Sequence, residues 1–117
     1  MRAMRLRRTS DIDLVREGGE MRSDRLFTLR ARRNGLDVVR VAVASPRSLG
    51  PSVRRNRARR RVREAIRTLL QARRSAPGTD LFVIARPPAL EAPSEALRAA
   101  VARQLDAVLS DPRSGDE

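Results

Sequence analysis

The sequence predicts an α+β protein with a single sheet, built as one domain over residues 1–117. Apolar residues recur at helical spacing in some segments, and in others they alternate or run continuously, as in strands. The resulting order is helix, two or more strands, helix, strand, helix, which is typical of this fold class. Because 40% of the 117 residues are hydrophobic and only two are aromatic, the core must be aliphatic. We expect an ordered core over about residues 5–109 and frayed ends.

The first half of the chain is expected to form one short helix and two strands. Ser10 is a candidate N-cap, and two glycines at positions 18 and 19 end the apolar pattern that follows it. Residues 26–31 alternate apolar and polar side chains, which predicts a half-buried strand. Asn34 and Gly35 mark a turn, and residues 38–44 predict a second strand.

The second half is expected to form two helices around a buried strand. Residues 45–52 are a Pro/Gly loop, and the helix after it has one apolar stripe: Ala58, Val62, Ala65, Ile66, Leu69 and Leu70. Residues 81–85 are apolar without alternation, as expected of a strand covered on both faces. Ser94 can cap a last helix whose Leu97, Val101, Leu105, Val108 and Leu109 share one face.

Composition excludes several kinds of catalyst. All 26 basic residues are arginine, the net charge is +12, and the chain has no His, Cys or Lys. Catalytic triads, Schiff-base lysines and His or Cys metal sites are therefore impossible, and we predict no catalytic and no metal-binding residue in the protein. Asp11, Asp13 and Glu17 resemble a magnesium cluster, but acids in a first helical turn also complement the helix dipole. No stretch has the roughly 18 apolar residues of a membrane span, and no signal peptide is recognisable, which favours the cytoplasm.

The densest positive charge lies on the helix that follows the Pro/Gly loop. Seven of the ten residues 54–63 are arginine, and Glu64 is the only acid between residues 53 and 70. The apolar stripe docks this helix on the sheet, and Asn56, Arg60, Arg63 and Arg67 lie in a narrow arc on the far side. A solubilising surface normally mixes charges of both signs, so we favour binding of a polyanion over a merely solvated face. A membrane-surface or groove-binding helix would need a bulkier exposed apolar face.

Residues 47–63 resemble the signature of the bacterial ribonuclease P protein subunit. The matching residues are Arg47, Gly50, Val53, Arg55, Asn56, Arg57, Arg59, Arg60 and Arg63. Three further segments resemble the family's opening helix, its first strand, and its last strand with the Arg-Pro turn after it. They are LRRTSDIDLVREGG, DRLFTLRAR and LFVIARPPA, so that the resemblance covers about residues 5–109.

The resemblance implies an α/β sandwich similar to a ribosomal-protein domain, with an unusual left-handed strand–helix–strand crossover. It implies a subunit of a magnesium-dependent ribonucleoprotein endonuclease whose RNA cuts the 5′ leader from precursor tRNA, with the magnesium held mostly by RNA. The implied contacts to the catalytic RNA are Arg47, Arg55, Asn56, Arg57, Arg59, Arg60, Arg63 and Arg67. The implied contacts to the leader, in a cleft between the first helix and the sheet, are Ile12, Arg16, Phe27 and Arg30.

Four positions depart from the family pattern. Ile12 and Arg16 stand where the first helix usually brings aromatic residues, Arg30 replaces a frequent Tyr, and Ser48 replaces a second basic residue. Base stacking on aromatics is a standard way to bind single-stranded RNA, and arginine planes can serve instead. Apart from its RNA partners we expect the protein to be monomeric. The alternative is a structural ribosomal or general RNA-binding protein with no role in cleavage.

Overall fold

The structure, a computed structural model, describes residues 3–110. Over these residues the chain forms a five-stranded sheet and three α-helices, with two short 3-10 turns. The strands are β1 (Ala3–Arg5), β2 (Glu20–Ser23), β3 (Phe27–Arg33), β4 (Val39–Ala44) and β5 (Thr79–Ala85). The helices are α1 (Thr9–Gly18), α2 (Ser52–Ala72) and α3 (Ser94–Leu109), and the 3-10 turns are η1 (Arg47–Leu49) and η2 (Pro87–Leu90). The α+β class predicted from the sequence is confirmed.

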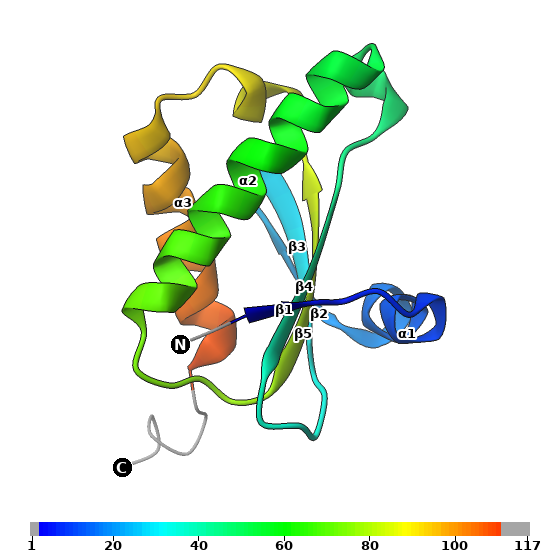
Figure 1. The fold of residues 1–117 in the computed structure, drawn as a ribbon, viewed down its shortest axis with the longest axis vertical. Coiled ribbons are helices and arrows are strands. Elements are labelled where there is room, and N and C mark those ends of the chain that lie inside the picture. Colours follow the sequence, from blue (N-terminus) through cyan, green and yellow to red (C-terminus); the bar gives the residue numbers. More distant parts are fainter. Residues whose placement is uncertain (1–2, 111–117) are drawn as a thin grey trace.

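The sheet is mixed, with strand order β1-β4-β5-β3-β2. Strands β1, β4 and β5 are parallel, and β3 and β2 run antiparallel to their neighbours. Helices α2 and α3 cover one face and α1 lies on the other, so that the sheet forms the middle layer (Figure 1). The turn at Asn34 and Gly35 is confirmed, with φ +72° at Gly35, but it does not join neighbouring strands, because β5 lies between β3 and β4.

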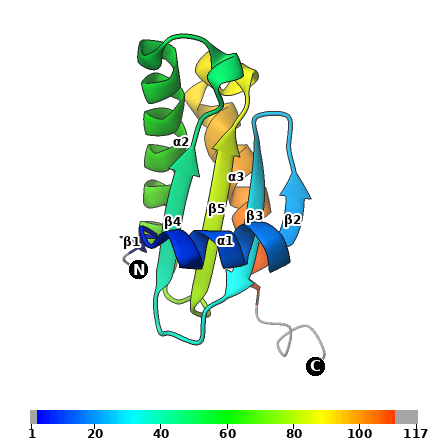
Figure 2. The same ribbon diagram turned by 90° about the vertical axis from the view of Figure 1, so that its right-hand side faces the viewer.

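The connection from β4 through α2 to β5 is left-handed. In Figure 2 both strands point upward, β5 lies to the right of β4, and α2 lies behind the sheet. A path that moves to the right while passing behind the sheet has a left-handed sense, whereas right-handed crossovers dominate among known proteins. This unusual feature was expected only from the family resemblance.

The core lies between the sheet and the α2–α3 layer. The stripe predicted on α2 is confirmed, because Ala58, Val62, Ala65, Ile66 and Leu70 are buried and Leu69 packs partly buried against them. The equivalent face of α3 is buried from Leu97 to Leu109. With α2 held along this stripe, the rest of its circumference is free for charged side chains.

Two strands and two helix starts differ from the sequence-based expectation. The edge strands β1 and β2 were not predicted, because each is only three or four residues long and lacks an apolar pattern. Helix α1 begins at Thr9 with Arg8 at the cap position and no side-chain cap, so the prediction of Ser10 as N-cap is wrong. Helix α3 begins at Ser94 with Pro93 at the cap position, so the prediction of Ser94 as its cap is wrong. The frayed end expected after residue 110 lies outside the described residues.

Candidate nucleic-acid interface

A glycine turn directs the chain into α2. Gly50 has φ +114°, a conformation that glycine adopts far more readily than other residues, and a Cβ there would lie 3.1 Å from the Arg54 side chain. The Arg54 Nε donates a hydrogen bond to the carbonyl oxygen of Leu49 at 3.0 Å. Ser45 Oγ donates to the carbonyl oxygen of Arg55 at 3.0 Å, which fastens the end of β4 to the same turn. The first turn of α2 is therefore held rigidly at the start of the arginine segment.

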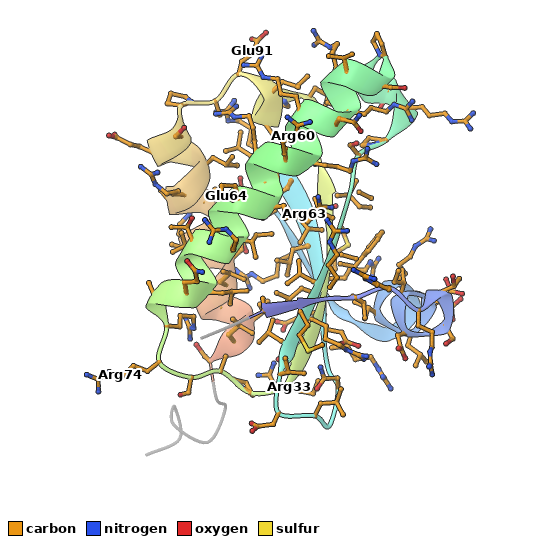
Figure 3. The ribbon with its side chains drawn as sticks, viewed as in Figure 1. Arg33, Arg60, Arg63, Glu64, Arg74 and Glu91 are labelled. Atoms are coloured by element: carbon orange, nitrogen blue, oxygen red, sulfur yellow. The ribbon has the colours of Figure 1, made fainter. Side chains whose placement is uncertain are left out.

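Six polar residues form the outward surface of α2, which we call the arginine face: Asn56, Arg57, Arg59, Arg60, Arg63 and Arg67. Figure 3 shows Arg60 on the open side of the helix and Arg63 on the side toward the edge of the sheet. Within residues 3–110, Arg57 and Arg60 are exposed and have no hydrogen-bond or ion-pair partner. Arg59 donates to Asn56 Oδ1, and Arg67 is paired with Glu64. Most of the charge on this face is thus available to an external anion.

The electrostatics of the arginine face reflect crowding of like charges. Burial lowers the pKa of Arg63, and the neighbouring cations Arg5 and Arg59 lower it further. The hydrogen bond and charge of Glu64 raise the pKa of Arg67, and the same bond lowers the pKa of Glu64. Glu64 therefore neutralises one end of the face, while the stretch around Arg63 carries uncompensated positive charge.

Two residues predicted to bind RNA lie outside the arginine face. Arg47 is exposed in η1, just before α2. Arg55 is half-buried on the inner side of the helix, where its Nε is buried without a partner and its Nη2 donates to Ser52 Oγ at 3.2 Å. Arg55 therefore lies on the docking side of the helix and not on the arginine face.

A second basic region lies where α1 crosses the sheet (Figure 2). One row of side chains runs across the strands on this side, in the order Met21, Arg30, Phe82, Ala42. The guanidinium carbon of Arg16 lies 5.6 Å from the centre of the Phe82 ring, within the range of a cation–π contact. We call Arg16, Arg30, Phe82 and Met21 the α1 face.

Arg30 is held beside this contact by weak hydrogen bonds. Its Nη1 donates to the carbonyl oxygen of Gly19 and its Nη2 to the sulfur of Met21, both at 3.5 Å. Gly19 allows the chain to pass close to the end of α1, because a Cβ there would lie 2.5 Å from the carbonyl oxygen of Val15. Ile12 lies partly buried on the same helix. The structure thus brings Arg16 and Arg30 together, as the sequence predicted.

Phe27 does not belong to the α1 face, and the prediction that it does is wrong. Its side chain is 1% exposed and lies in the core under α2 and α3. Successive strand residues point to opposite faces, so Phe27 and Arg30, three positions apart, cannot share one. The aromatic residue on the α1 side is Phe82, which the sequence analysis missed because the apolar run at 81–85 shows no alternation. The sequence analysis also missed Arg5 as a cation next to Arg63 of the arginine face, because strand β1, which contains Arg5, was not predicted.

No group of three or more His, Cys, Asp or Glu side chains within residues 3–110 is arranged to hold a metal ion. Across the same residues, no helix combines the length and the apolar character needed to span a bilayer. The site is therefore best described by its arginines.

The fold and these two basic faces define a small single-domain α+β protein suited to binding RNA. The family model "Ribonuclease P" matches residues 1–108, and the chain therefore belongs to the ribonuclease P protein family. It is 44% identical over 105 residues to the ribonuclease P protein component of Chloroflexus aggregans, covering 89% of this chain and 76% of that protein. It is 42% identical over 89 residues to that of a Roseiflexus species, covering 76% and 71%.

Solved structures show the same fold. The ribonuclease P protein of Thermotoga maritima superposes with a TM-score of 0.77 at 26% identity, covering 91% of this chain and 98% of that one. That of Staphylococcus aureus superposes with a TM-score of 0.75 at 22% identity, covering 93% and 100%. Family membership makes this chain the protein component of a tRNA-processing ribonucleoprotein endoribonuclease, with the ribonuclease P RNA as its partner. The alternative of a ribosomal protein is set aside.

Proposed function

We propose that the arginine face of α2 binds the ribonuclease P RNA, and that the α1 face binds the 5′ leader of precursor tRNA. The observation on which this rests is the set of outward arginines on α2 that, among residues 3–110, have no acidic partner apart from Glu64. Arginine suits phosphate because its planar fork donates two parallel hydrogen bonds. Arg47 extends the arginine face at its start, and Arg55 supports the helix from its inner side.

The protein supplies binding rather than bond cleavage in this proposal. Without His, Cys or Lys the chain has no conventional general base beyond scattered carboxylates to activate a serine or threonine hydroxyl. We propose that magnesium ions of the holoenzyme are held mainly by RNA phosphates, and that the +12 charge of the protein reduces the magnesium needed for assembly. The complex would act in the cytoplasm, where precursor tRNA is made.

The α1 face suits a single strand rather than a duplex. Phe82 offers part of a ring, Arg16 lies over it, and Arg30 stands next to it in the row. A base can stack on a ring or on a guanidinium plane, and the same arginines can bind the adjoining phosphate. Here the contacts to the leader are thus mainly electrostatic, with one aromatic residue.

The leader assignment is tested with the double substitution Arg16→Ala and Arg30→Ala in the assembled holoenzyme. Loss of one stacked base costs about 1–3 kcal/mol, so affinity for precursor tRNA should fall at least about fivefold. Affinity for mature tRNA should stay unchanged, because only the precursor has a leader. Fluorescence binding with matched precursor and mature tRNA measures both.

Arg98→Ala, an exposed arginine on α3 at the other side of the sheet, is the matched control. Equal losses for precursor and mature tRNA would place Arg16 and Arg30 against the tRNA body or the RNA subunit. No loss with either ligand would make them ordinary surface charges. Either result would refute the leader assignment.

A further inference from the structure

A pocket of about 190 Å³ lies where β1 meets the C-terminal half of α2. It is lined by Ala3, Met4 and Arg5 of β1, by Val41 of β4, and by Ile66 and two arginines of α2. In the sheet register Ala3 and Arg5 stand opposite Val39 and Val41, whose side chains face α2. The pocket therefore opens between the sheet edge and the helix and borders the arginine face.

The lining combines an apolar floor with a rim of cations. Ala3, Val41 and Ile66 form part of the aliphatic core or pack against it, and Arg5, Arg63 and Arg67 surround them. None of the described residues that line the pocket is a carboxylate, and Glu64 pairs with Arg67 on the outer side of the helix. An apolar surface bordered by arginines fits a ligand with a flat ring and a negative charge.

Among the arginines of the pocket, Arg63 is the one whose charge a bound anion would stabilise most. It is half-buried and has no hydrogen-bond partner within residues 3–110. Its charged neighbours are the two cations Arg5 and Arg59, which repel it. Burial and these two cations together lower the pKa of Arg63, so its positive charge, which the side chain keeps, is less well stabilised than that of a solvated arginine. A bound phosphate would remove this penalty.

The size of the pocket limits the ligand. Sites for drug-sized molecules or cofactors have volumes of roughly 300–1,000 Å³, so a pocket of about 190 Å³ takes a smaller group. Proteins that recognise RNA loops commonly bind single bases that have left the stack. A base with its own phosphate matches both the floor and the rim.

We propose that this pocket binds one unstacked nucleotide of the ribonuclease P RNA. Its phosphate contacts Arg5 and Arg63, and its base lies on the floor formed by Ala3, Val41 and Ile66. The inference rests on the proposed binding of this RNA by the arginine face of α2, and it adds β1 to the RNA-binding surface.

The test separates the base from the phosphate with two substitutions. Ala3→Phe fills the floor without changing charge, and Arg5→Gln removes one cation from the rim. In salt titrations with the ribonuclease P RNA, Ala3→Phe should lower affinity about 5- to 150-fold and leave the slope of log K against log salt unchanged. Arg5→Gln should reduce that slope by about one unit.

Matched controls are Ala99→Phe on α3 and Arg74→Gln in the loop after α2, both exposed positions outside the pocket and expected to bind as wild type. Thermal melting shows whether Ala3→Phe folds, and Ala3→Leu is a smaller filler in the same place. Wild-type affinity for folded Ala3 variants would overturn the inference, even if Arg5→Gln lowered the slope, because no base would then occupy the floor. Arg57→Gln tests the arginine face independently. If the pocket variants bind the RNA normally while Arg57→Gln binds it more weakly, the pocket inference fails and the proposed function stands. If Arg57→Gln also binds normally, both the pocket inference and the proposed function fail.

Discussion

Arg40 on β4 and Arg60 on α2 lie on different sides of the molecule and differ in what surrounds them. Arg40 donates two hydrogen bonds of 2.7 Å to the buried carboxylate of Asp80 and one of 3.4 Å to Asp11. Arg60 is exposed and has no partner within residues 3–110. In a chain whose basic residues are all arginine, the partner rather than the residue type distinguishes a structural cation from an RNA ligand.

Other arginines resemble Arg40 in that their hydrogen bonds to other parts of the fold give them a structural role. Arg33 donates to the carbonyl oxygens of Val108 and Ser110 at 2.8 and 3.1 Å, where the C-terminal end of the α3 dipole favours a cation. Arg61 donates to the carbonyl oxygen of Ala89 at 2.6 Å and also to that of Ala92, which fastens α2 to the segment before α3. An arginine count therefore overstates the surface available to RNA.

The largest effect is expected from Arg40→Met. This change leaves Asp80, whose side chain is 6% exposed, without its charged partner, and such losses cost about 3–5 kcal/mol. The bond to Asp80 raises the pKa of Arg40 against the opposing effect of burial, which indicates a strong interaction. Urea unfolding followed by circular dichroism measures the loss.

The double variant Arg40→Met with Asp80→Leu is the matched comparison. Replacing both members of a buried pair by apolar residues is often nearly neutral, so much of the lost stability should return. If Arg40→Met unfolds at the wild-type urea concentration, the pair is not structural and the contrast between β4 and α2 disappears.

A smaller effect, on RNA binding alone, is expected from Arg57→Gln with Arg60→Gln. Each phosphate contact that is lost should reduce the slope of log K against log salt by up to about one unit. Stability should stay within about 0.5 kcal/mol of wild type, because neither side chain has a partner in the part of the chain that the structure describes. Unchanged slopes with both residues replaced would show that the face is merely solvated.

The fold was predictable wherever apolar residues repeat over a long segment. The stripe of α2 and the last helix follow directly from spacing, and their burial agrees. Strands β1 and β2 were not predictable, because short edge strands depend on pairing with a neighbour more than on their own pattern. The left-handed crossover was predictable only from the family resemblance, since the general rule favours the opposite hand.

The residues of the arginine face on α2 were predictable from the sequence, whereas the residues that the sheet contributes to the α1 face were less so. The arginine face follows from the stripe, because the charged side chains occupy the remaining circumference of α2. Arg55 lies three and seven residues before Ala58 and Val62 of the buried stripe, so helical spacing alone already places it on the inner side of α2. Phe27 was misplaced although its strand alternates, and that alternation already placed it opposite Arg30. The position of Phe82 beside Arg30 could be known only from the register of β5 against β3.

The smallest effect concerns Asp24, which joins the turn between β2 and β3 to helix α3. Its carboxylate accepts the N–H of Leu26 at 3.0 Å, and Gln104 and Arg103 of α3 also donate to it. Burial by itself raises the pKa of Asp24, but these hydrogen bonds and the Arg103 charge outweigh burial and lower it below the ordinary value. The charged form is therefore favoured in the folded protein.

A lowered folded-state pKa means that the stabilisation by Asp24 is complete above the pKa of the unfolded chain, about 4. It is lost as the pH falls through the lower pKa of the folded protein. The difference in unfolding free energy between wild type and Asp24→Asn should accordingly be present at pH 6 and shrink as the pH approaches 3. Arg103→Gln removes one donor to Asp24 together with its charge. The difference in unfolding free energy between wild type and Arg103→Gln should shrink over the same pH range, by a smaller amount. Urea unfolding across this range measures both differences, and a difference that is constant or grows toward low pH would contradict the favoured charge on Asp24.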